Sequence, residues 1–288
     1  MRNKVLFFSI VIAIGVLTFY WVKSSEDAPK QTMGKDTNID HLKGLEQKVT
    51  AFNIDGRTSK GVKQWHLEGN TAEMIDGKIY FNDLAAIAYG EEATVNLVSD
   101  KGIYDKENGE VTLIGNVKVT SDDGSVLTTE KATWSQKTKY ISSDVLVRIE
   151  RDNMVATGKG GMASSSDKMA MLKENVEVKI EPDTKVNSDG PLVVKHDENI
   201  AVFSDNVKVE DKDGKLFADK LTVHLSPETQ KIAKVVAEGN VKVRRGRSYT
   251  ISEKAIYTES TKSAKLLGNP QVIIDPGELQ QLEGIGRK

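Results

Sequence analysis

The sequence predicts an all-β protein: an open, elongated, twisted β-jellyroll or solenoid built from two-strand repeats, preceded by one N-terminal transmembrane helix. Three observations predict this class. Apolar residues alternate with polar ones along most of the chain, turn dipeptides interrupt the alternation, and one short motif recurs at a nearly constant interval.

The N-terminal end predicts a membrane anchor. Residues 5–22 (VLFFSIVIAIGVLTFYWV) carry no charge and as a helix would span about 27 Å, close to the roughly 30 Å of a bilayer core. Arg2 and Lys4 precede them, so the positive-inside rule places residues 1–4 in the cytoplasm. A cleaved signal peptide is the alternative, but no small-residue cleavage site follows. Residues 23–47 are polar and without clear periodicity, which predicts a tether.

The repeat is visible as a strand motif. Its copies are LIGNVKV (113–119), LKENVEV (172–178), FSDNVKV (203–209), AEGNVKV (237–243), LGNPQVI (267–273) and the weaker SSDVLVRI (142–149). The asparagine-equivalent positions are 116, 144, 175, 206, 240 and 269. An upstream strand with an acidic residue and a lysine precedes several copies: SDKGIYD (99–105), TEKATWS (129–135), ADKLTVH (218–224) and SEKAIYT (252–258). Such a two-strand unit buries its apolar face only by stacking on neighbours.

The motif also predicts local backbone features. Gly-Asn or Asp-Asn tolerates a left-handed backbone, so we expect a bend or bulge at the start of the strand that follows. In that strand the valines would face inward, and Lys118, Lys208 and Lys242 outward. Dipeptides that favour tight hairpins recur elsewhere: Asp55-Gly56, Asp76-Gly77, Asn108-Gly109, Asp123-Gly124, Asp189-Gly190 and Asp213-Gly214. A closed meander barrel and an open jellyroll both fit, and the near-constant repeat length favours the open form.

Composition and motifs argue against several classes of function. The chain has 40 basic and 42 acidic residues, so its charge offers no broad field for nucleic acid. It has no cysteine, and its four histidines form no zinc or hydrolase motif, so we expect no enzyme activity, no cofactor and no metal. Asp211 and Asp213 mimic the start of a calcium loop, but Thr222 stands where the loop needs glutamate, and a hairpin turn fits better.

The chain resembles a known family. Residues 100–134 (DKGIYDKENGEVTLIGNVKVTSDDGSVLTTEKATW) and 217–243 (FADKLTVHLSPETQKIAKVVAEGNVKV) are similar to the OstA-like repeat of the lipopolysaccharide-transport bridge. The anchor followed by QWHLEGNTAEMIDGKIYFNDLAAIAY (64–89) resembles the LptC subunit. The last hundred residues look more like an LptA module, so the resemblance implies an LptC-LptA-like fusion, with residues 48–185 LptC-like and 186–288 LptA/OstA-like.

This resemblance implies a function and partners. A single-pass inner-membrane protein would have its β-domains in the periplasm, receive lipopolysaccharide from an ATP-binding-cassette transporter of the LptB, LptF and LptG type, and pass it to an LptA-type or outer-membrane LptD-type protein by strand pairing. The acyl chains would lie in an apolar groove lined by Ile103, Val111, Leu113, Val117, Val119, Val207, Val209, Leu221, Val223, Val241 and Val243. The pairing edge would be Gln271, Val272, Ile273 and Ile274.

Structural alternatives remain open for each of these residues. Any groove residue could simply pack in a core, and the three lysines could be solvated rather than bind lipid phosphates. Trp65 and Trp134 are expected to be core aromatics. The alternative function is a periplasmic β-repeat stalk or adaptor that binds no lipid; an efflux-type fusion adaptor would need a long heptad hairpin, which the sequence lacks.

Overall fold

The computed structural model describes residues 47–57, 61–89, 94–122, 124–135, 137–164 and 167–275. The described residues form two compact units. The N-terminal unit contains residues up to 152 together with 160–168, and the C-terminal unit contains 153–159 together with 169–275. No helix among the described residues is long and apolar enough to cross a membrane, and the expected anchor at 5–22 lies outside them.

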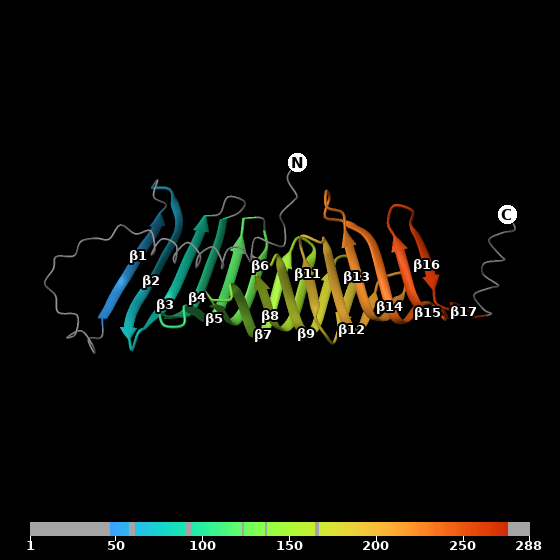
Figure 1. Cartoon of the computed structure of the whole chain (residues 1–288), viewed down its shortest axis with the longest axis horizontal. Coiled ribbons are helices and arrows are strands. Elements are labelled where there is room, and N and C mark those ends of the chain that lie inside the picture. The colour runs from blue at the N-terminus through green and yellow to red at the C-terminus, as the bar shows by residue number, and fades with distance from the viewer. Residues whose placement is uncertain are drawn as a thin grey trace. The chain divides into compact units, whose positions relative to one another are not determined.

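The N-terminal unit is a ladder of antiparallel strands that pair in chain order (Figure 1). Its strands are β1 (Gln47–Arg57), β2 (Lys63–Ile75), β3 (Lys78–Tyr89), β4 (Thr94–Asp105), β5 (Glu110–Ser121), β6 (Val126–Ser135) and β7 (Tyr140–Arg151). Strand β8 (Met154–Ser164) has residues in both units. Among the described residues β1 pairs only with β2, so this ladder does not close into a barrel.

The C-terminal unit repeats the same plan. Its strands are β9 (Met169–Ile180), β10 (Thr184–Ser188), β11 (Leu192–Lys195), β12 (Ile200–Glu210), β13 (Lys215–Leu225), β14 (Ile232–Arg245), β15 (Ser248–Thr258), β16 (Ser263–Leu267) and β17 (Gln271–Ile273). β10 and β11 lie end to end between β9 and β12, and β16 and β17 lie end to end beside β15. The all-β class and the open ladder are therefore confirmed.

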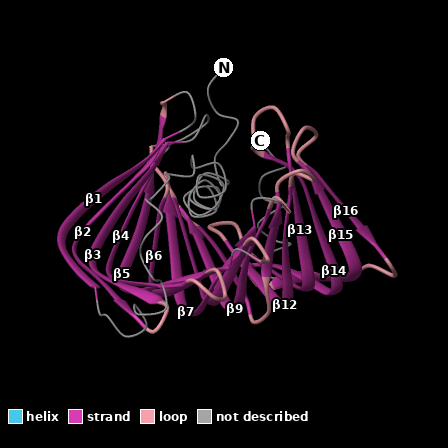
Figure 2. Ribbon diagram, turned by 60° about the vertical axis from the view of Figure 1, so that its left-hand side comes forward, coloured by secondary structure: helices cyan, strands magenta, loops and turns pink. Residues whose placement is uncertain are grey.

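The repeated asparagines mark bulges in the middle of long strands. Asn116, Asn206 and Asn240 have φ of 46°, 51° and 48°, and the register to the neighbouring strand shifts at each of them. An extra residue in one strand bends that strand and increases its twist. Figure 2 shows β1 to β5 curving along their length. The expected bulge is thus confirmed, but it bends one continuous strand instead of starting a new one.

Two of the expected hairpin turns are wrong. Asp76 and Gly77 do form the β2–β3 turn, with φ of 48° and 76°. Asp55-Gly56 instead lies within β1, where Gly56 lets the indole of Trp65 pack against the backbone: a Cβ there would be 2.0 Å from the ring. Asp189-Gly190 lies at the break between β10 and β11, in the position of a strand bend.

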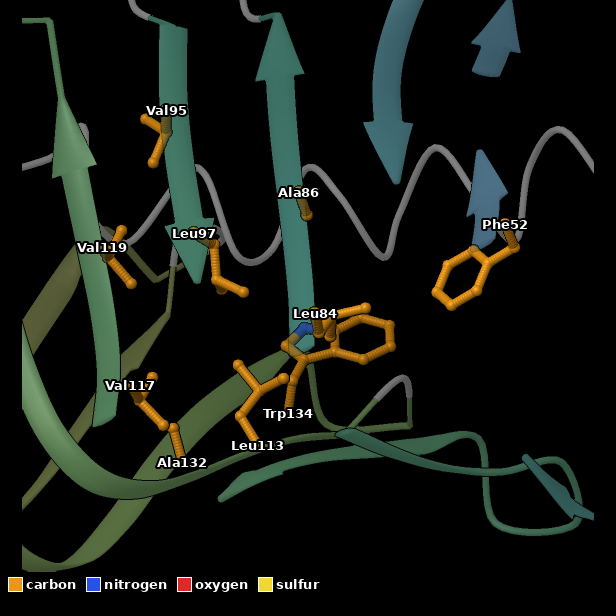
Figure 3. Packing of buried hydrophobic residues seen from close by; sticks show 10 residues of the cluster. All are labelled: Phe52, Leu84, Ala86, Val95, Leu97, Leu113, Val117, Val119, Ala132 and Trp134. Atoms are coloured by element: carbon orange, nitrogen blue, oxygen red, sulfur yellow. The ribbon is translucent and has the colours of Figure 1, made fainter. Parts of the chain in front are cut away.

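The core of the N-terminal unit is a single apolar cluster. Figure 3 shows its buried members: Phe52, Leu84, Ala86, Val95, Leu97, Leu113, Val117, Val119, Ala132 and Trp134. They come from β1, β3, β4, β5 and β6, on both sides of the bends. Trp65 and Trp134 are 5% and 3% exposed, which confirms that both are core aromatics.

Candidate functional site

Three strand bends among the described residues are stabilised by a repeated set of side chains, which we call the corner. In the first corner the amide of Asn116 on β5 donates to the carboxylate of Asp100 on β4, at 2.9 Å. The same carboxylate lies over Gly115, where an added Cβ would be 2.5 Å from it. Asn206 donates to Asp189 at 2.7 Å and Asn240 to Asp219 at 2.9 Å in the matching positions. The acidic residue of the upstream strand therefore fixes the asparagine of the next strand.

A serine stands just before the acid in the corners of Asp100 and Asp189, and another precedes the equivalent Glu253. In the third corner alanine precedes Asp219. Ser99, Ser188 and Ser252 each donate to the carbonyl oxygen two residues ahead, at 3.1, 3.1 and 3.2 Å. Ser99 and Ser188 are buried, so these bonds satisfy hydroxyls that would otherwise cost free energy. The sequence analysis recognised the acid and the lysine of this motif but missed the hydroxyl, although a serine or threonine precedes the acid in SDKG, TEKA and SEKA.

Between the corners and the hairpin turns, one face of each unit is apolar. Residues directly opposite each other in a ladder share a face, and residues two apart along a strand share it too. By this rule ten of the eleven expected groove residues lie on the apolar face of their unit: Val111, Leu113, Val117, Val119, Val207, Val209, Leu221, Val223, Val241 and Val243. We call this the inner face.

Burial varies systematically along the inner face. Leu113, Val117 and Val119 are at most 3% exposed, and so are Val207, Leu221 and Val241. Val111, Val209, Val223 and Val243 are only half-buried. Six of the ten inner-face residues are therefore enclosed by protein contacts, whereas these four keep accessible apolar surface.

Ile103 does not lie on the inner face. It pairs with Thr112 and Tyr80, whereas its neighbour Gly102 pairs with the buried Leu113. Side chains alternate along β4, so Ile103 points to the opposite, outer face. The sequence did not reveal the outer position of Ile103, because the inner position next to it is Gly102, which has no apolar side chain to mark the inner face. We therefore leave Ile103 out of the candidate groove.

The three lysines of the repeat lie on the outer face. Lys118 is exposed, Lys208 pairs with Glu210 at 2.9 Å, and Lys242 lies 4.4 Å from the centre of the Tyr249 ring. Each of these lysines lies between two valines of its strand that point to the inner face, so the lysines point outward, as the sequence predicted.

The expected partner edge is β17. Gln271, Val272 and Ile273 form it, Ile274 follows directly, and β15 is the one described strand with which β17 pairs. Val272 is 61% and Ile274 48% exposed. Among residues 47–275 that the structure describes, no strand pairs with the far side of β17, and its apolar side chains are exposed, a combination that favours pairing with another strand.

No group of three or more histidine, aspartate and glutamate side chains is placed to hold a metal ion within the described residues. Asp211 accepts the amides of Asp213 and Gly214, both at 2.8 Å, so the calcium-like sequence forms an ordinary hairpin turn.

Both parts of the chain match models of known protein families. A family model described as lipopolysaccharide-assembly, LptC-related, matches residues 9–181. A second model, described as LptA/(LptD N-terminal domain) LPS transport protein, matches residues 185–284. No curated protein matches the chain. Among solved structures, LptH from Pseudomonas aeruginosa, the LptA homologous periplasmic component of the lipopolysaccharide transport device, is 15% identical over 63% of this chain and 95% of its own, with a TM-score of 0.19. That score is too low to support an argument about the fold.

Proposed function

Because the chain belongs to the LptC-related lipopolysaccharide-assembly family and continues into an LptA-like part, we propose that it binds lipopolysaccharide acyl chains on its inner faces and relays the lipid towards the outer membrane. The observation that carries the proposal is that each unit has its own apolar inner face: the two faces together carry ten of the expected groove residues, and the half-buried ones leave surface for a ligand. Each CH₂ group removed from water gains about 0.8 kcal/mol, so such a face suits acyl chains.

Photo-crosslinking from neighbouring residues tests the proposal. A photoreactive amino acid at Val111 or Val223, both half-buried on the inner face, should give adducts that stain for lipopolysaccharide. The same group at Thr112 or Thr222, the adjacent half-buried positions on the outer face, should not. Equal lipid labelling at inner and outer positions, or protein-only adducts at all four, would instead support a stalk with a filled interior.

For the partners, we propose that the inner-membrane transporter is of the LptB, LptF and LptG type and that β17 pairs with a strand of an LptA-type or LptD-type protein. Aspartate at Val272 and Ile274 should abolish co-purification with that protein, because charge is unfavourable in a packed strand interface. The matched control is Ile232→Asp, an exposed apolar residue at 44% that lies on β14, away from the edge. Unchanged co-purification of the edge variant would exclude β17 as the docking strand.

For the location, we propose residues 1–4 in the cytoplasm, a membrane helix at 5–22 and a tether at 23–47, followed by periplasmic modules at 48–185 and 186–288. The absence of cysteine makes the topology simple to test. In spheroplasts, a membrane-impermeant maleimide should label Ser25→Cys and leave Arg2→Cys unlabelled. Recovery of a mature chain that begins at Ser24 or Ser25 would show cleavage in place of anchoring.

A further inference from the structure

The outer face of the C-terminal unit carries a band of charge that crosses five strands. Pairing aligns one row across β9, β10, β12, β13 and β14: Lys179, Lys185, Glu210, Lys215 and Arg244. The second row, two residues along each strand, is Glu177, Asn187, Lys208, Phe217 and Lys242. The first row lies next to the hairpin turns, at the ends of the strands. We call this edge of the unit the rim.

The band has a strong excess of positive charge. It contains six cationic and two carboxylate side chains, in a chain whose overall net charge is −2. Lys179 and Lys185 flank Glu177 at 2.8 and 2.5 Å, and Lys208 and Lys215 both pair with Glu210. These lysines lower the pKa of each carboxyl group to about 2, so both stay ionised at neutral pH.

The end of β14 holds the cations that no carboxylate neutralises. Among the described residues, Lys242, Arg244 and Arg245 have no ion pair. The Nε of Arg244 donates to the Gly246 carbonyl at 3.0 Å, and Lys242 lies over the Tyr249 ring. Lys215 stands directly opposite Arg244, and like charges in that arrangement are destabilising. An anion bound here would relieve the repulsion.

The inner positions of β14 lead directly to these cations. Val241 is 1% exposed, Val243 is half-buried, and Arg245, the next residue of the same parity, is exposed. At about 3.3 Å per residue, Val241 and Arg245 are roughly 13 Å apart. One strand thus passes from buried apolar surface to exposed guanidinium within the length of a short acyl segment.

We propose that Lys242 and Arg244 on the outer face and Arg245 on the inner face together form a phosphate-binding site around the end of β14, at the rim of the C-terminal unit. The site holds the phosphorylated head group of the lipid whose chains lie on the inner face. This inference rests on the proposed function. The planar guanidinium groups donate paired hydrogen bonds to phosphate, and the ammonium of Lys242 adds a point charge. The site would orient the lipid with its sugar outside and its chains inside.

Crosslinking from Val223 in the full-length protein, held in amphipol, provides the readout, because that residue reports occupancy of the inner face. Two ligands with the same acyl chains are compared: lipid A with both phosphates and its fully dephosphorylated form. The unmodified protein should need about tenfold less of the bisphosphorylated lipid for half-maximal labelling, since each exposed charge pair contributes modestly. The preference should shrink as NaCl is raised.

The test variant is K242Q/R244Q/R245Q, and the matched control K231Q/K234Q/K265Q removes the same charge from exposed lysines elsewhere in the unit. The test variant should bind both lipids with the affinity that the unmodified protein has for the dephosphorylated lipid, and this binding also shows that the variant is folded. The control should keep the preference for the bisphosphorylated lipid.

Equal binding of the two lipids by the unmodified protein, or a preference kept by the test variant, would overturn the rim site and leave the proposed groove unaffected. A site for free anions alone would show as competition by inorganic phosphate without any lipid preference, and this too overturns the inference. Failure of both lipids to label Val223 would reject the proposed function itself.

Discussion

Replacing Gly115 with alanine tests the corner, the element on which the bent ladder depends. Gly115 has φ of 80°, a conformation that costs an alanine about 1 kcal/mol. The new Cβ would also lie 2.5 Å from the Asp100 carboxylate. Asp100 would have to move and lose the hydrogen bond from Asn116, which contributes about another 1 kcal/mol. We therefore expect the free energy of unfolding to fall by about 2 kcal/mol.

Gly124→Ala is the matched control. Gly124 has a similar φ of 85°, but an added Cβ would meet nothing within 4 Å, so only the conformational cost of about 1 kcal/mol applies. Urea unfolding of the full-length protein, in a Trp21→Phe background, would be followed by the fluorescence of Trp65 and Trp134, both buried in the N-terminal unit. The midpoint of Gly115→Ala should lie about 0.5 M or more below that of the control. Equal midpoints would refute the role assigned to Asp100.

Three further predictions follow from the same structure. The pKa of the Glu210 carboxyl is lowered to about 2 by Lys215 and Lys208, so its ion pairs stabilise the fold fully above the ordinary pKa of 4.5 and are lost as the pH falls towards 2. The urea midpoint of Glu210→Gln should therefore change less between about pH 5 and 2.5 than that of the unmodified protein. An identical change in both proteins would contradict this role for Glu210. Val119→Thr, at a fully buried inner position, should cost about 1–3 kcal/mol in thermal or urea unfolding, whereas Ile103→Thr on the outer face should cost less than about 1; similar losses would reject the assignment of faces. Gly56→Ala should displace the Trp65 indole and shift its emission to the red, and an unshifted spectrum would show that β1 adapts without moving the ring.

Much of the fold could be predicted because its signals are local. Alternation along a strand and the tolerance of asparagine and glycine for positive φ depend on a few neighbouring residues, so the two-strand repeats and the bulges at Asn116, Asn206 and Asn240 were visible in the sequence. The family resemblance to LptC, followed by an LptA-like part, was also visible there and agrees with the matched models.

Other features depend on how one strand pairs with the next. The outer position of Ile103 follows from its pairing with Thr112, and a glycine at the neighbouring inner position concealed it. The acid–asparagine bonds join different strands, so their purpose could not be read from either strand alone. The sequence by itself determined the repeats, the bulges and the apolar alternation, because those follow from local backbone chemistry. Only the tertiary structure decided which side chains share a face and which cations meet at the rim, because strand register is set by pairing between strands and cannot be read from one strand alone.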